Sequence, residues 1–352
     1  MAKNAFEATS LDPYIIAEIG MNYEGSMSRA KEMISAVARA GGHAAKFQTY
    51  KADTLASREH SPAYWDTTKE ATQSQHELFQ RFDAFGPAQY QELADHCAAE
   101  GVDFMSTPFD FEAVDYLEPL VPQFKVASAD LTNVPLLRRI ARTGKPVIVS
   151  VGAATHDEIR ASLAVLREAG ATQIALLHCV LRYPTPAEIA NISAIRTLAA
   201  EFGDQVAIGY SDHVPPTESG DVPALKLALA YGATILEKHY TDDRTGIGND
   251  HYHAFDEAGL QAFTEELALM RVLAGSDTPD VASQQAAVDN ARRRVIAHAD
   301  LAAGTVLTEE HLIPLRANVG VEIARWDEVV GAALTVDKKA GEPILDTDIS
   351  AR

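Results

Sequence analysis

The sequence has few cysteines and no long hydrophobic segment. Cys97 and Cys179 are the only cysteines among 352 residues, too few for a disulfide framework. The longest apolar runs, such as residues 174–180, are much shorter than the roughly 20 residues that a membrane-spanning helix needs. The N-terminal segment MAKNAFEATSLDPY lacks the uninterrupted apolar stretch of a secretory signal. We therefore expect a cytoplasmic protein with no membrane association. Burial of apolar side chains, rather than disulfide bonds, must stabilise its fold.

Basic residues are also scarce compared with acidic ones. Thirty Lys and Arg stand against fifty Asp and Glu, a net charge of -20. The summed field repels polyanions, which argues against binding to nucleic acid or to anionic membrane surfaces. A small anionic substrate is still compatible, because salt screens distant charges over roughly 8 Å and a local group of Lys and Arg can dominate a cleft.

Short β-rich apolar segments alternate along the chain with segments of helical spacing. Such alternation is typical of βα units built on a parallel sheet. Eight units within about 275 residues predict a (β/α)8 TIM barrel, whereas a doubly wound sheet more often has five to seven strands. The expected strands are residues 15–20, 44–49, 103–109, 124–128, 146–152, 174–180, 206–212 and 234–240.

Glycines mark the ends of the predicted helices, which include residues 28–40, 87–100, 156–169 and 217–231. A glycine directly after a helix can adopt the left-handed conformation that closes the last turn. The positions with this placement are Gly41, Gly101, Gly144, Gly170 and Gly232.

Two segments interrupt the repeating pattern. The connection from Thr49 to Asp103 contains extra polar and aromatic residues, and a long βα insertion lies on the active face of a barrel, so we expect a lid there. We assign residues 1–275 to the barrel and the polar residues 276–291 to a linker. Residues 292–352 have short apolar pieces separated by glycine turns, which predicts a small β-rich domain that needs a docking partner for stability.

The predicted strand ends carry many polar side chains. Catalytic groups of a parallel barrel come from the carboxyl ends of its strands. Lys46 and Gln48 lie two residues apart and so face the same side of their strand. Charged residues seldom occupy strands without a partner, which makes this concentration a candidate site. The other strand-end residues are Glu18, Thr107, Phe109, Asp110, Lys125, Ser128, Asp130, His178, Cys179, Ser211, Asp212, His213, Glu237, Lys238 and His239.

Some of these residues also have purely structural interpretations. Asp110 and Asp130 are as suited to capping the next helix as to binding a substrate. His178 is expected to be a hydrogen-bonded core residue and Cys179 to be inert. Lys238 could form a solvated ion pair.

Lys46 and Lys125 are harder to explain structurally. A lysine within an apolar strand needs a nearby anion to stay charged. Both residues therefore indicate a phosphate or carboxylate ligand.

Histidines near the last two strands are candidate metal ligands. His213 and His239 end adjacent strands, where their imidazoles could bind one divalent ion or act as acids or hydrogen-bond donors. His251 and His253 form a competing pair. Asp250 precedes them on the last βα loop, where its carboxylate could bind a substrate hydroxyl.

Eight ordered segments resemble the sialic acid synthase family across nearly the whole chain. They are IIAEIGMNYEG, AAKFQTYKADTL, FMSTPFD, FKVASADLTNVPLL, TGKPVIVSVGAAT, ALLHCVLRYPTP, GYSDH and LEKHYTDD. The C-terminal segment RRVIAHADLAAGTVLTEEHLIPLRANVGV is similar to the antifreeze-like (SAF) domain that follows the barrel in that family. The resemblance implies a C–C bond-forming transferase that condenses phosphoenolpyruvate with an open-chain N-acetylated hexosamine. The products would be a nine-carbon 2-keto-3-deoxy sugar acid of the nonulosonate type and phosphate.

The resemblance also implies roles for single residues. A Mn²⁺ ion, or another divalent cation such as Mg²⁺ or Co²⁺, would be held by His213 and His239 and would act as a Lewis acid on the sugar aldehyde. Glu18 matches the family's acid/base. Arg316 matches an arginine that enters the partner's active site in a domain-swapped homodimer. Phosphoenolpyruvate would be held by Lys46, Lys125, Thr107, Ser128 and Ser211, and the sugar hydroxyls would be contacted by Asp130, Tyr183 and Asp250. Gln48 and Phe109 are further substrate-binding residues.

Several positions depart from the family's usual motifs. They are Tyr23, Glu24, Leu181, Arg182, the loop residues Gly248-Asn249-Asp250, and Leu315-Arg316-Ala317-Asn318. In the family these positions lie near the sugar, so we predict an acceptor that differs from N-acetylmannosamine. The candidates are a diacetamido-trideoxyhexose, a non-acetylated mannose and a phosphorylated sugar. Two alternative functions are a metal-dependent aldolase that uses pyruvate and a catalytically silent barrel that binds carbohydrate.

Overall fold

The computed structural model describes residues 3–68, 70–248 and 250–350. Asn249, which the sequence places in the sugar loop, lies outside the described residues. The chain divides into two compact units, one that ends at Ala274 and one that begins at Gly275.

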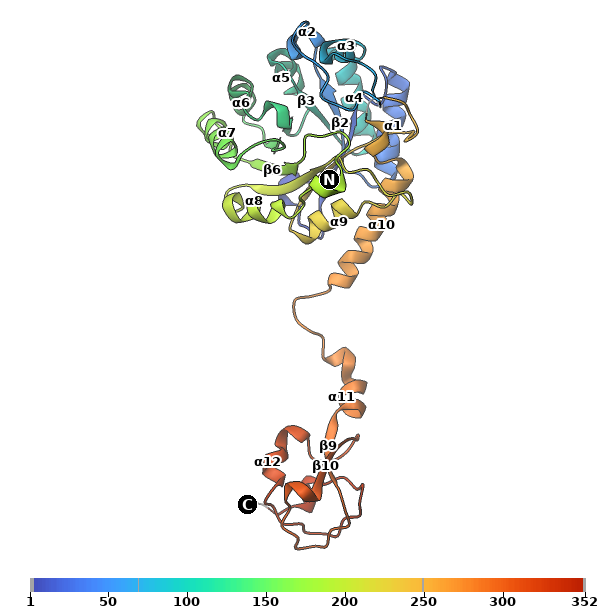
Figure 1. Cartoon of the computed structure of the whole chain (residues 1–352), viewed down its shortest axis with the longest axis vertical. Coiled ribbons are helices and arrows are strands. Elements are labelled where there is room, and N and C mark those ends of the chain that lie inside the picture. Colours follow the sequence, from blue (N-terminus) through green and yellow to red (C-terminus); the bar gives the residue numbers. More distant parts are fainter. Residues whose placement is uncertain (1–2, 69, 249, 351–352) are drawn as a thin grey trace. The chain divides into compact units, whose positions relative to one another are not determined.

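The first unit is a (β/α)8 barrel, as the sequence predicts. Its strands form one parallel eight-stranded sheet in the order β3-β2-β1-β8-β7-β6-β5-β4, and the outer strands β3 and β4 pack against each other. Helices surround this sheet (Figure 1). The strands are β1 (Tyr14–Gly20), β2 (Ala44–Thr49), β3 (Asp103–Pro108), β4 (Phe124–Val126), β5 (Val147–Ser150), β6 (Ile174–Cys179), β7 (Ala207–Asp212) and β8 (Ile235–His239).

The helices of the barrel are close to the predicted ones, and all five predicted capping glycines have positive φ angles between 72° and 114°. One predicted helix was too long, because residues 217–222 form a loop and the helix begins at Pro223, a residue suited to a first turn. The helices are α1 (Met27–Arg39), α2 (Ala52–Leu55), α3 (Gln75–Gln80), α4 (Pro87–Glu100), α5 (Phe111–Leu117), α6 (Val134–Ala141), α7 (His156–Glu168), α8 (Ala194–Phe202), α9 (Pro223–Ala230) and α10 (Glu257–Ala274).

The interior of the barrel has an apolar amino end. Alternate strand residues point inward, and those near the amino ends of the strands pack into one buried cluster that Ala5 of the short helix η1 (Ala5–Glu7) joins. We call this cluster the amino-end layer. Its strand residues are Tyr14, Ile16, Ala44, Met105, Ile148, Ala175, Leu177 and Ile235.

The next inward-facing residues along the strands are polar. Ile16 is followed on its face by Glu18, Ala44 by Lys46, and Ile235 by Glu237. Parallel pairing places Glu18 beside Lys46 on one side and beside His239 on the other. The polar set predicted from the sequence is therefore one continuous layer at the carboxyl end of the barrel.

The second unit is small and contains less regular β-structure than expected. Among the described residues its ladder consists of β9 (Arg293–Ala297) and β10 (Leu312–Arg316), which pair antiparallel, with isolated bridges elsewhere. The segment assigned to a linker includes helix α11 (Gln285–Ala291), and α12 (Trp326–Val329) lies between the glycine turns. No helix among the described residues of either unit is long and apolar enough to cross a bilayer. A buried cluster holds the small unit together: Val295, Ala297, Leu301, Leu307, Leu312, Val321, Val329, Leu334 and Ile344.

Candidate active site

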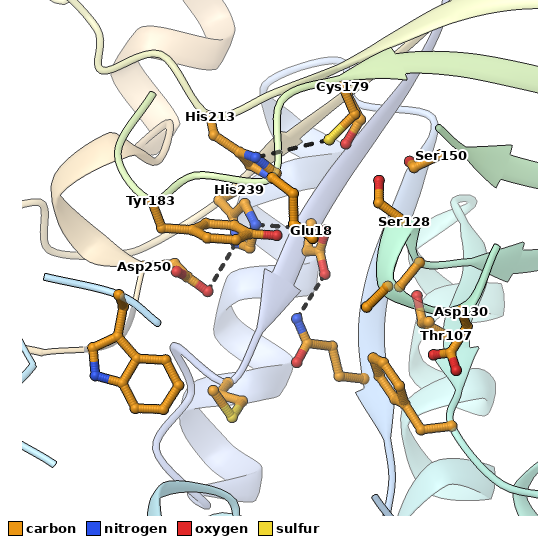
Figure 2. A pocket seen from close by; sticks show the side chains of 18 of the residues that line it. Glu18, Thr107, Ser128, Asp130, Ser150, Cys179, Tyr183, His213, His239 and Asp250 are labelled. Atoms are coloured by element: carbon orange, nitrogen blue, oxygen red, sulfur yellow. Dashed lines mark hydrogen bonds and ion pairs between the residues drawn. The ribbon is translucent and has the colours of Figure 1, made fainter. Parts of the chain in front are cut away.

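A cavity of about 420 Å³ opens at the carboxyl end of the barrel. This volume is in the range of small-molecule sites. Figure 2 shows side chains that line it, among them Glu18, Tyr183, His213 and Asp250. Arg316, the remaining predicted site residue, is exposed at the end of β10 in the second unit. Thirteen predicted site residues line the cavity: Glu18, Lys46, Gln48, Thr107, Phe109, Lys125, Ser128, Asp130, Tyr183, Ser211, His213, His239 and Asp250.

The two buried lysines lie at the floor of this cavity. Lys46 Nζ is 2.8 Å from Glu18 Oε1 and donates to Thr107 Oγ1 at 3.2 Å. Lys125 Nζ donates to Ser150 Oγ at 2.7 Å and to the Val126 carbonyl oxygen at 3.0 Å. Burial lowers the pKa of Lys125 below its usual value. Both ammonium groups are thus fixed in place by side chains of neighbouring strands.

Glu237, which the sequence places among the strand-end residues without a role of its own, joins the two lysines. Its Oε2 lies 3.5 Å from Lys46 Nζ and its Oε1 lies 3.4 Å from Lys125 Nζ. Ser211 Oγ also donates to Oε1, at 2.8 Å. The anions that the buried lysines require are therefore supplied by Glu18 and Glu237, in addition to any substrate. The spacing of Glu237 from His239 on one strand face was the signal that could have identified it.

Glu18 is held in its ionised form. Burial by itself raises the pKa of this carboxyl group, but Lys46 and the amide of Gln48 lower it below its ordinary value. Gln48 Nε2 donates to Glu18 Oε1 at 2.9 Å. A carboxylate in this state is a base rather than an acid.

His213 and His239 converge, with ring centroids 5.4 Å apart. Nδ1 of His213 lies 2.9 Å from the Val180 carbonyl oxygen, so this nitrogen carries a hydrogen. Burial by itself lowers the pKa of the His213 ring, but the neighbouring Cys179 raises it to about 9, so Nε2 must release its proton when it binds a metal ion. His239 Nδ1 lies 3.3 Å from Asp250 Oδ2. Burial lowers the pKa of His239 well below its usual value, which keeps the ring neutral. Neutral imidazoles are the form that binds metals.

Cys179, which the sequence predicts to be inert, lies in the site. It lines the cavity, and its Sγ lies 3.9 Å from His213 Nδ1. Burial by itself raises the pKa of the thiol, but the neighbouring His213 lowers it below its ordinary value. Cys179 therefore contributes to the electrostatics around His213.

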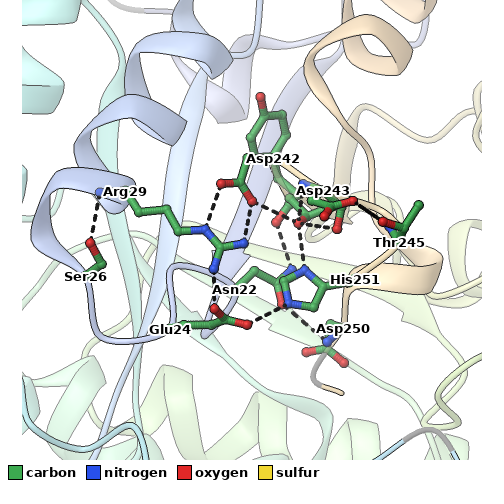
Figure 3. Close-up of polar contacts among 11 residues, drawn as sticks. Asn22, Glu24, Ser26, Arg29, Asp242, Asp243, Thr245, Asp250 and His251 are labelled. Carbon is green, nitrogen blue, oxygen red and sulfur yellow. Dashed lines mark hydrogen bonds and ion pairs between the residues drawn. The ribbon is translucent and has the colours of Figure 1, made fainter. Parts of the chain in front are cut away.

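His251 and His253 do not form a pair, which corrects the competing ligand set. His251 Nδ1 lies 2.7 Å from Thr241 Oγ1, and its Nε2 lies 3.5 Å from Glu24 Oε1. Figure 3 shows His251 among these polar contacts. His253 instead faces the site, with its ring centroid 4.8 Å from that of His239. The two rings serve different surroundings because the short helix η4 (His251–His253) turns them apart.

A polar network outside the cavity holds the loop between β8 and α10 (Figure 3). Arg29 forms ion pairs with Glu24 and Asp242, the second at 2.6 Å. Asn22 Oδ1 accepts from the Asp250 backbone N–H at 3.3 Å, and its Nδ2 donates to the Tyr240 carbonyl oxygen at 2.9 Å. This network positions the loop that presents Asp250 to the cavity.

The departures at Tyr23 and Glu24 therefore act away from the substrate. Tyr23 packs against Phe47 and Phe85, with centroids 5.8 Å and 4.9 Å away. Neither Tyr23 nor Glu24 is among the described residues that line the cavity, in contrast to Leu181. The prediction that all these positions lie near the sugar is corrected for these two.

Part of the cavity wall is aromatic and apolar. Tyr64 and Trp65 come from the insertion after β2, which thus covers the site as predicted. Tyr252 and Leu181, from later loops, also line the cavity. This wall suits the methyl groups and ring carbons of a substituted sugar.

Polar side chains interrupt the apolar wall. The ring of Tyr183 packs 4.1 Å from that of His213. Asp250 is half-buried, and burial followed by the charge of Glu18 raises the pKa of Asp250 to about 7. Asp130 accepts from Asn133 Nδ2 at 2.8 Å. Both carboxyl groups can therefore bind hydroxyl or amide groups of a ligand.

The structural interpretations have mixed outcomes. Asp110 caps α5 by accepting from Ala113 N–H at 2.7 Å, as expected. Asp130 caps no helix, because β4 ends at Val126, earlier than predicted, and Asn133 caps α6 instead.

Two further structural predictions concern buried residues. His178 Nε2 lies 2.9 Å from the Ala190 carbonyl oxygen, which confirms its expected role in the core. Lys238 pairs with Asp212 at 2.7 Å, but both side chains are buried, so the expectation of a solvated pair was wrong. Lys238 lies on the outward face of β8, next to the inward-facing Glu237 and His239.

The imidazole cluster fits a divalent metal ion. Buried polar atoms are nearly always hydrogen-bonded in proteins, yet His239 Nδ1 has no hydrogen-bond partner among the described residues. Imidazole nitrogens with an adjacent carboxylate are the donor set of many divalent metal sites. The residues present therefore match the expected group.

The sequence matches the NeuB family over residues 33–278 and the SAF domain over residues 292–350, which confirms both resemblances. N,N'-diacetyllegionaminic acid synthase from Legionella pneumophila is 31% identical over 97% of this chain and 96% of that protein. The protein of the same name from Campylobacter jejuni is 32% identical over 94% of this chain and 98% of its own length. The crystal structure of N-acetylneuraminic acid (sialic acid) synthetase from Leptospira borgpetersenii, in complex with citrate, is 32% identical with a TM-score of 0.66 and covers 78% of this chain and 90% of that one.

Proposed function

Because this chain belongs to the NeuB family of sugar-acid synthases, we propose that it condenses phosphoenolpyruvate with an open-chain N-acylated aldose. C3 of phosphoenolpyruvate forms a bond to the aldehyde carbon, and water adds to C2. The tetrahedral adduct then expels inorganic phosphate and leaves a 2-keto-3-deoxy sugar acid. The observation that carries this proposal is the set of two fixed lysines beside two converging imidazoles at one end of the barrel.

The floor of the cavity supplies the donor site. Lys46 and Lys125 are ready to bind the phosphate and carboxylate of phosphoenolpyruvate, with Thr107, Ser128 and Ser211 as further hydrogen-bonding groups. Their ammonium groups are already oriented by Glu18, Glu237 and Ser150, so little reorganisation is needed when the anion binds. Fixing both reactants in one cavity converts a two-body encounter into a local reaction.

Glu18 is the base in this scheme. Lys46 and Gln48 keep its carboxylate ionised, so it can accept a proton from the water that adds to C2. This refines the family role of acid/base to that of a base for the hydration step.

His213 and His239 are the residues that would hold the divalent cation, for which Mn²⁺ is our first candidate and Mg²⁺ and Co²⁺ are alternatives. When bound there, such an ion supplies Lewis-acid activation of the sugar aldehyde. It also adds positive charge to a floor whose two lysines are already balanced by two carboxylates.

The aromatic wall favours a diacetamido-trideoxyhexose as the acceptor. Such a sugar replaces hydroxyl groups by methyl and acetamido groups, which Trp65, Tyr64 and Leu181 can cover. Lys46 and Lys125 are the only Lys or Arg side chains among the described residues that line the cavity, and we assign both to the donor. This argues against a phosphorylated acceptor. The two relatives named for N,N'-diacetyllegionaminic acid support the same choice.

We also propose a homodimer in which Arg316 of the partner subunit completes the site. Arg316 is exposed at the end of β10 on the small unit. A guanidinium group is suited to a carboxylate or phosphate because it can donate two parallel hydrogen bonds.

The test is an assay of the full-length chain with phosphoenolpyruvate, Mn²⁺ and a panel of acceptors. The panel contains diacetamido-trideoxyhexoses, N-acetylmannosamine, mannose and a 6-phosphorylated hexosamine. We expect phosphate release that requires both reactants, with the keto acid identified by mass spectrometry. Product formation from pyruvate without phosphate release would reject the proposal in favour of an aldolase.

A further inference from the structure

We infer that His253 is a third imidazole ligand of the divalent ion, in addition to His213 and His239. The inference rests on the proposed function, which needs such an ion in the cavity. It assigns to the ion a ligand from the loop after β8, whereas His213 and His239 come from the ends of two strands.

The first support is that His253 is fully buried with no hydrogen bond. Its side chain has 0% exposure, and neither Nδ1 nor Nε2 has a hydrogen-bond partner among the described residues. Its nearest carboxylate contact, from Nε2 to Asp250 Oδ1, is 3.7 Å, too long for a hydrogen bond. Leaving a buried polar group unsatisfied is costly, so an imidazole in this state indicates a ligand.

The second support is the spacing of the rings. An ion bound at one imidazole nitrogen lies about 3.2 Å from the ring centroid, so two rings on one ion are about 4.5 to 5.5 Å apart. The centroid of His253 is 4.8 Å from that of His239 and 5.8 Å from that of His213. One ligand atom from each of His239, Asp250 and His253 lies within 4.8 Å of the others. The three rings can therefore meet at one ion after small side-chain rotations.

The third support is the way in which the loop is fixed. Phe255 N–H donates to the His239 carbonyl oxygen at 2.7 Å, and Thr241 N–H donates to the Phe255 carbonyl oxygen at 2.8 Å. These bonds tie the backbone two residues beyond His253 to the end of β8. His253 is consequently held beside His239 by main-chain contacts, as a built ligand site requires.

A third imidazole changes which metals the site prefers. Nitrogen-rich sites favour late first-row ions such as Co²⁺ and Zn²⁺, whereas Mg²⁺ prefers oxygen ligands. We therefore expect Co²⁺ to bind this chain much more tightly than Mg²⁺, with Mn²⁺ between them.

The test measures metal binding without substrates, on the full-length chain. Co²⁺ affinity is determined by competition with a chromophoric chelator, and visible absorption of the Co²⁺ complex reports its coordination. We expect His253→Asn to weaken Co²⁺ binding at least about tenfold and to change the absorption bands. The effect on Mg²⁺ should be smaller, because Asn supplies an oxygen.

The matched control is His251→Asn, an equally buried histidine two residues away whose ring faces Thr241 and Glu24. It should alter Co²⁺ affinity less than threefold and leave the absorption bands unchanged. His253→Gln is a second variant in case the first does not fold, as judged by circular dichroism.

The outcomes separate this inference from the proposed function. Unchanged affinity and unchanged bands in a folded His253 variant would overturn the role of His253, while metal-dependent phosphate release by the wild type would leave the proposed function standing. If the wild-type chain bound neither Co²⁺ nor Mn²⁺, both would fail.

Discussion

The two ends of the barrel interior are built from the same strands but differ in almost every physical respect. At the amino end, inward-facing residues such as Ile16 and Ile235 form a fully apolar layer. Two residues further along the same strands, Glu18 and Glu237 begin a layer of charged and polar groups. The step from one layer to the next is only about 7 Å, given the rise of a strand.

This difference shows how one fold divides stability from chemistry. The amino-end layer contributes free energy of folding through burial, which is large and needs no precise partners. The carboxyl-end layer buries Lys46, Lys125, Glu18 and Glu237, whose desolvation offsets much of their mutual attraction. Substitutions in the amino-end layer should therefore lower the free energy of unfolding, whereas substitutions in the carboxyl-end layer should lower catalytic activity.

The largest effect is expected at the polar end, from Lys125→Met. The change removes a cation assigned to phosphoenolpyruvate and leaves Glu237 with one lysine instead of two. Losing one member of a buried charge pair costs about 2–5 kcal/mol, so we expect kcat/KM for phosphoenolpyruvate to fall roughly 10³-fold. Steady-state kinetics with varied phosphoenolpyruvate provides the measurement. A fall of less than tenfold would contradict the assignment of Lys125 to the donor.

The corresponding change at the apolar end is Leu177→Ala. Leu177 is completely buried in the amino-end layer. Cavity formation should lower the free energy of unfolding by about 2–5 kcal/mol. Below the unfolding temperature, kcat/KM should stay within about threefold of the wild-type value. Urea denaturation followed by circular dichroism measures the first quantity, and a large loss of activity in the folded variant would break the proposed division between the ends.

A smaller loss of stability is expected from Gly209→Ala in the same layer. A Cβ at this position would lie 2.3 Å from the Ile235 carbonyl oxygen and 2.4 Å from Leu177 Cδ2. Overpacking of this kind typically costs about 1–3 kcal/mol. In the double variant with Leu177→Ala the combined loss should be smaller than the sum, because one of the two clashes is removed. If the losses in the free energy of unfolding, measured by urea denaturation, were strictly additive, the clash with Leu177 would not contribute to the cost of Gly209→Ala.

The smallest effect concerns pH and His43, close to the amino end. Burial, followed by the charge of Lys3, lowers the pKa of His43 to about 4 from 6.5. Its Nδ1 accepts from the Ile15 N–H at 3.0 Å, which requires the unprotonated nitrogen. The unfolded chain therefore binds more protons between pH 6.5 and 4, and stability falls as pH decreases through this window.

His43→Gln should reduce that dependence. Because the His43 ring is partly exposed, we expect the variant to abolish only about 1 kcal/mol of the loss between pH 7 and pH 4.5. Urea midpoints at the two pH values test this, with His96→Gln, a partly exposed histidine of α4, as the control. If the urea midpoints of wild type and His43→Gln changed equally with pH, the lowered pKa of His43 would be contradicted.

The regular parts of the barrel were predictable from local patterns. The residues 87–100 and 44–49 were assigned with the bounds that the structure has, because each has a clear period and a defined end. The early end of β4 and the late start of α9 were missed, since Ser128 and Thr217 continue the local pattern while tertiary contacts end it.

The candidate site was predictable in its membership but not in its pairings. The rule that strand ends carry catalytic groups, together with the family resemblance, found thirteen of the lining residues. It could not show that Glu237 lies between the lysines, because that contact joins strands distant in sequence. It also could not separate His251 from His253, because the conformation of the short helix η4 decides which of the two rings faces the cavity.

The order of residues along this chain by itself determined the closed barrel, the glycine-capped helices and the family, because each follows from periodicity and local spacing. Only the tertiary structure decided which carboxylate neutralises which lysine and which imidazoles meet. Those choices depend on strand register and loop closure, which bring together groups as distant in the sequence as Lys46 and Glu237, and burial makes each such contact energetically decisive.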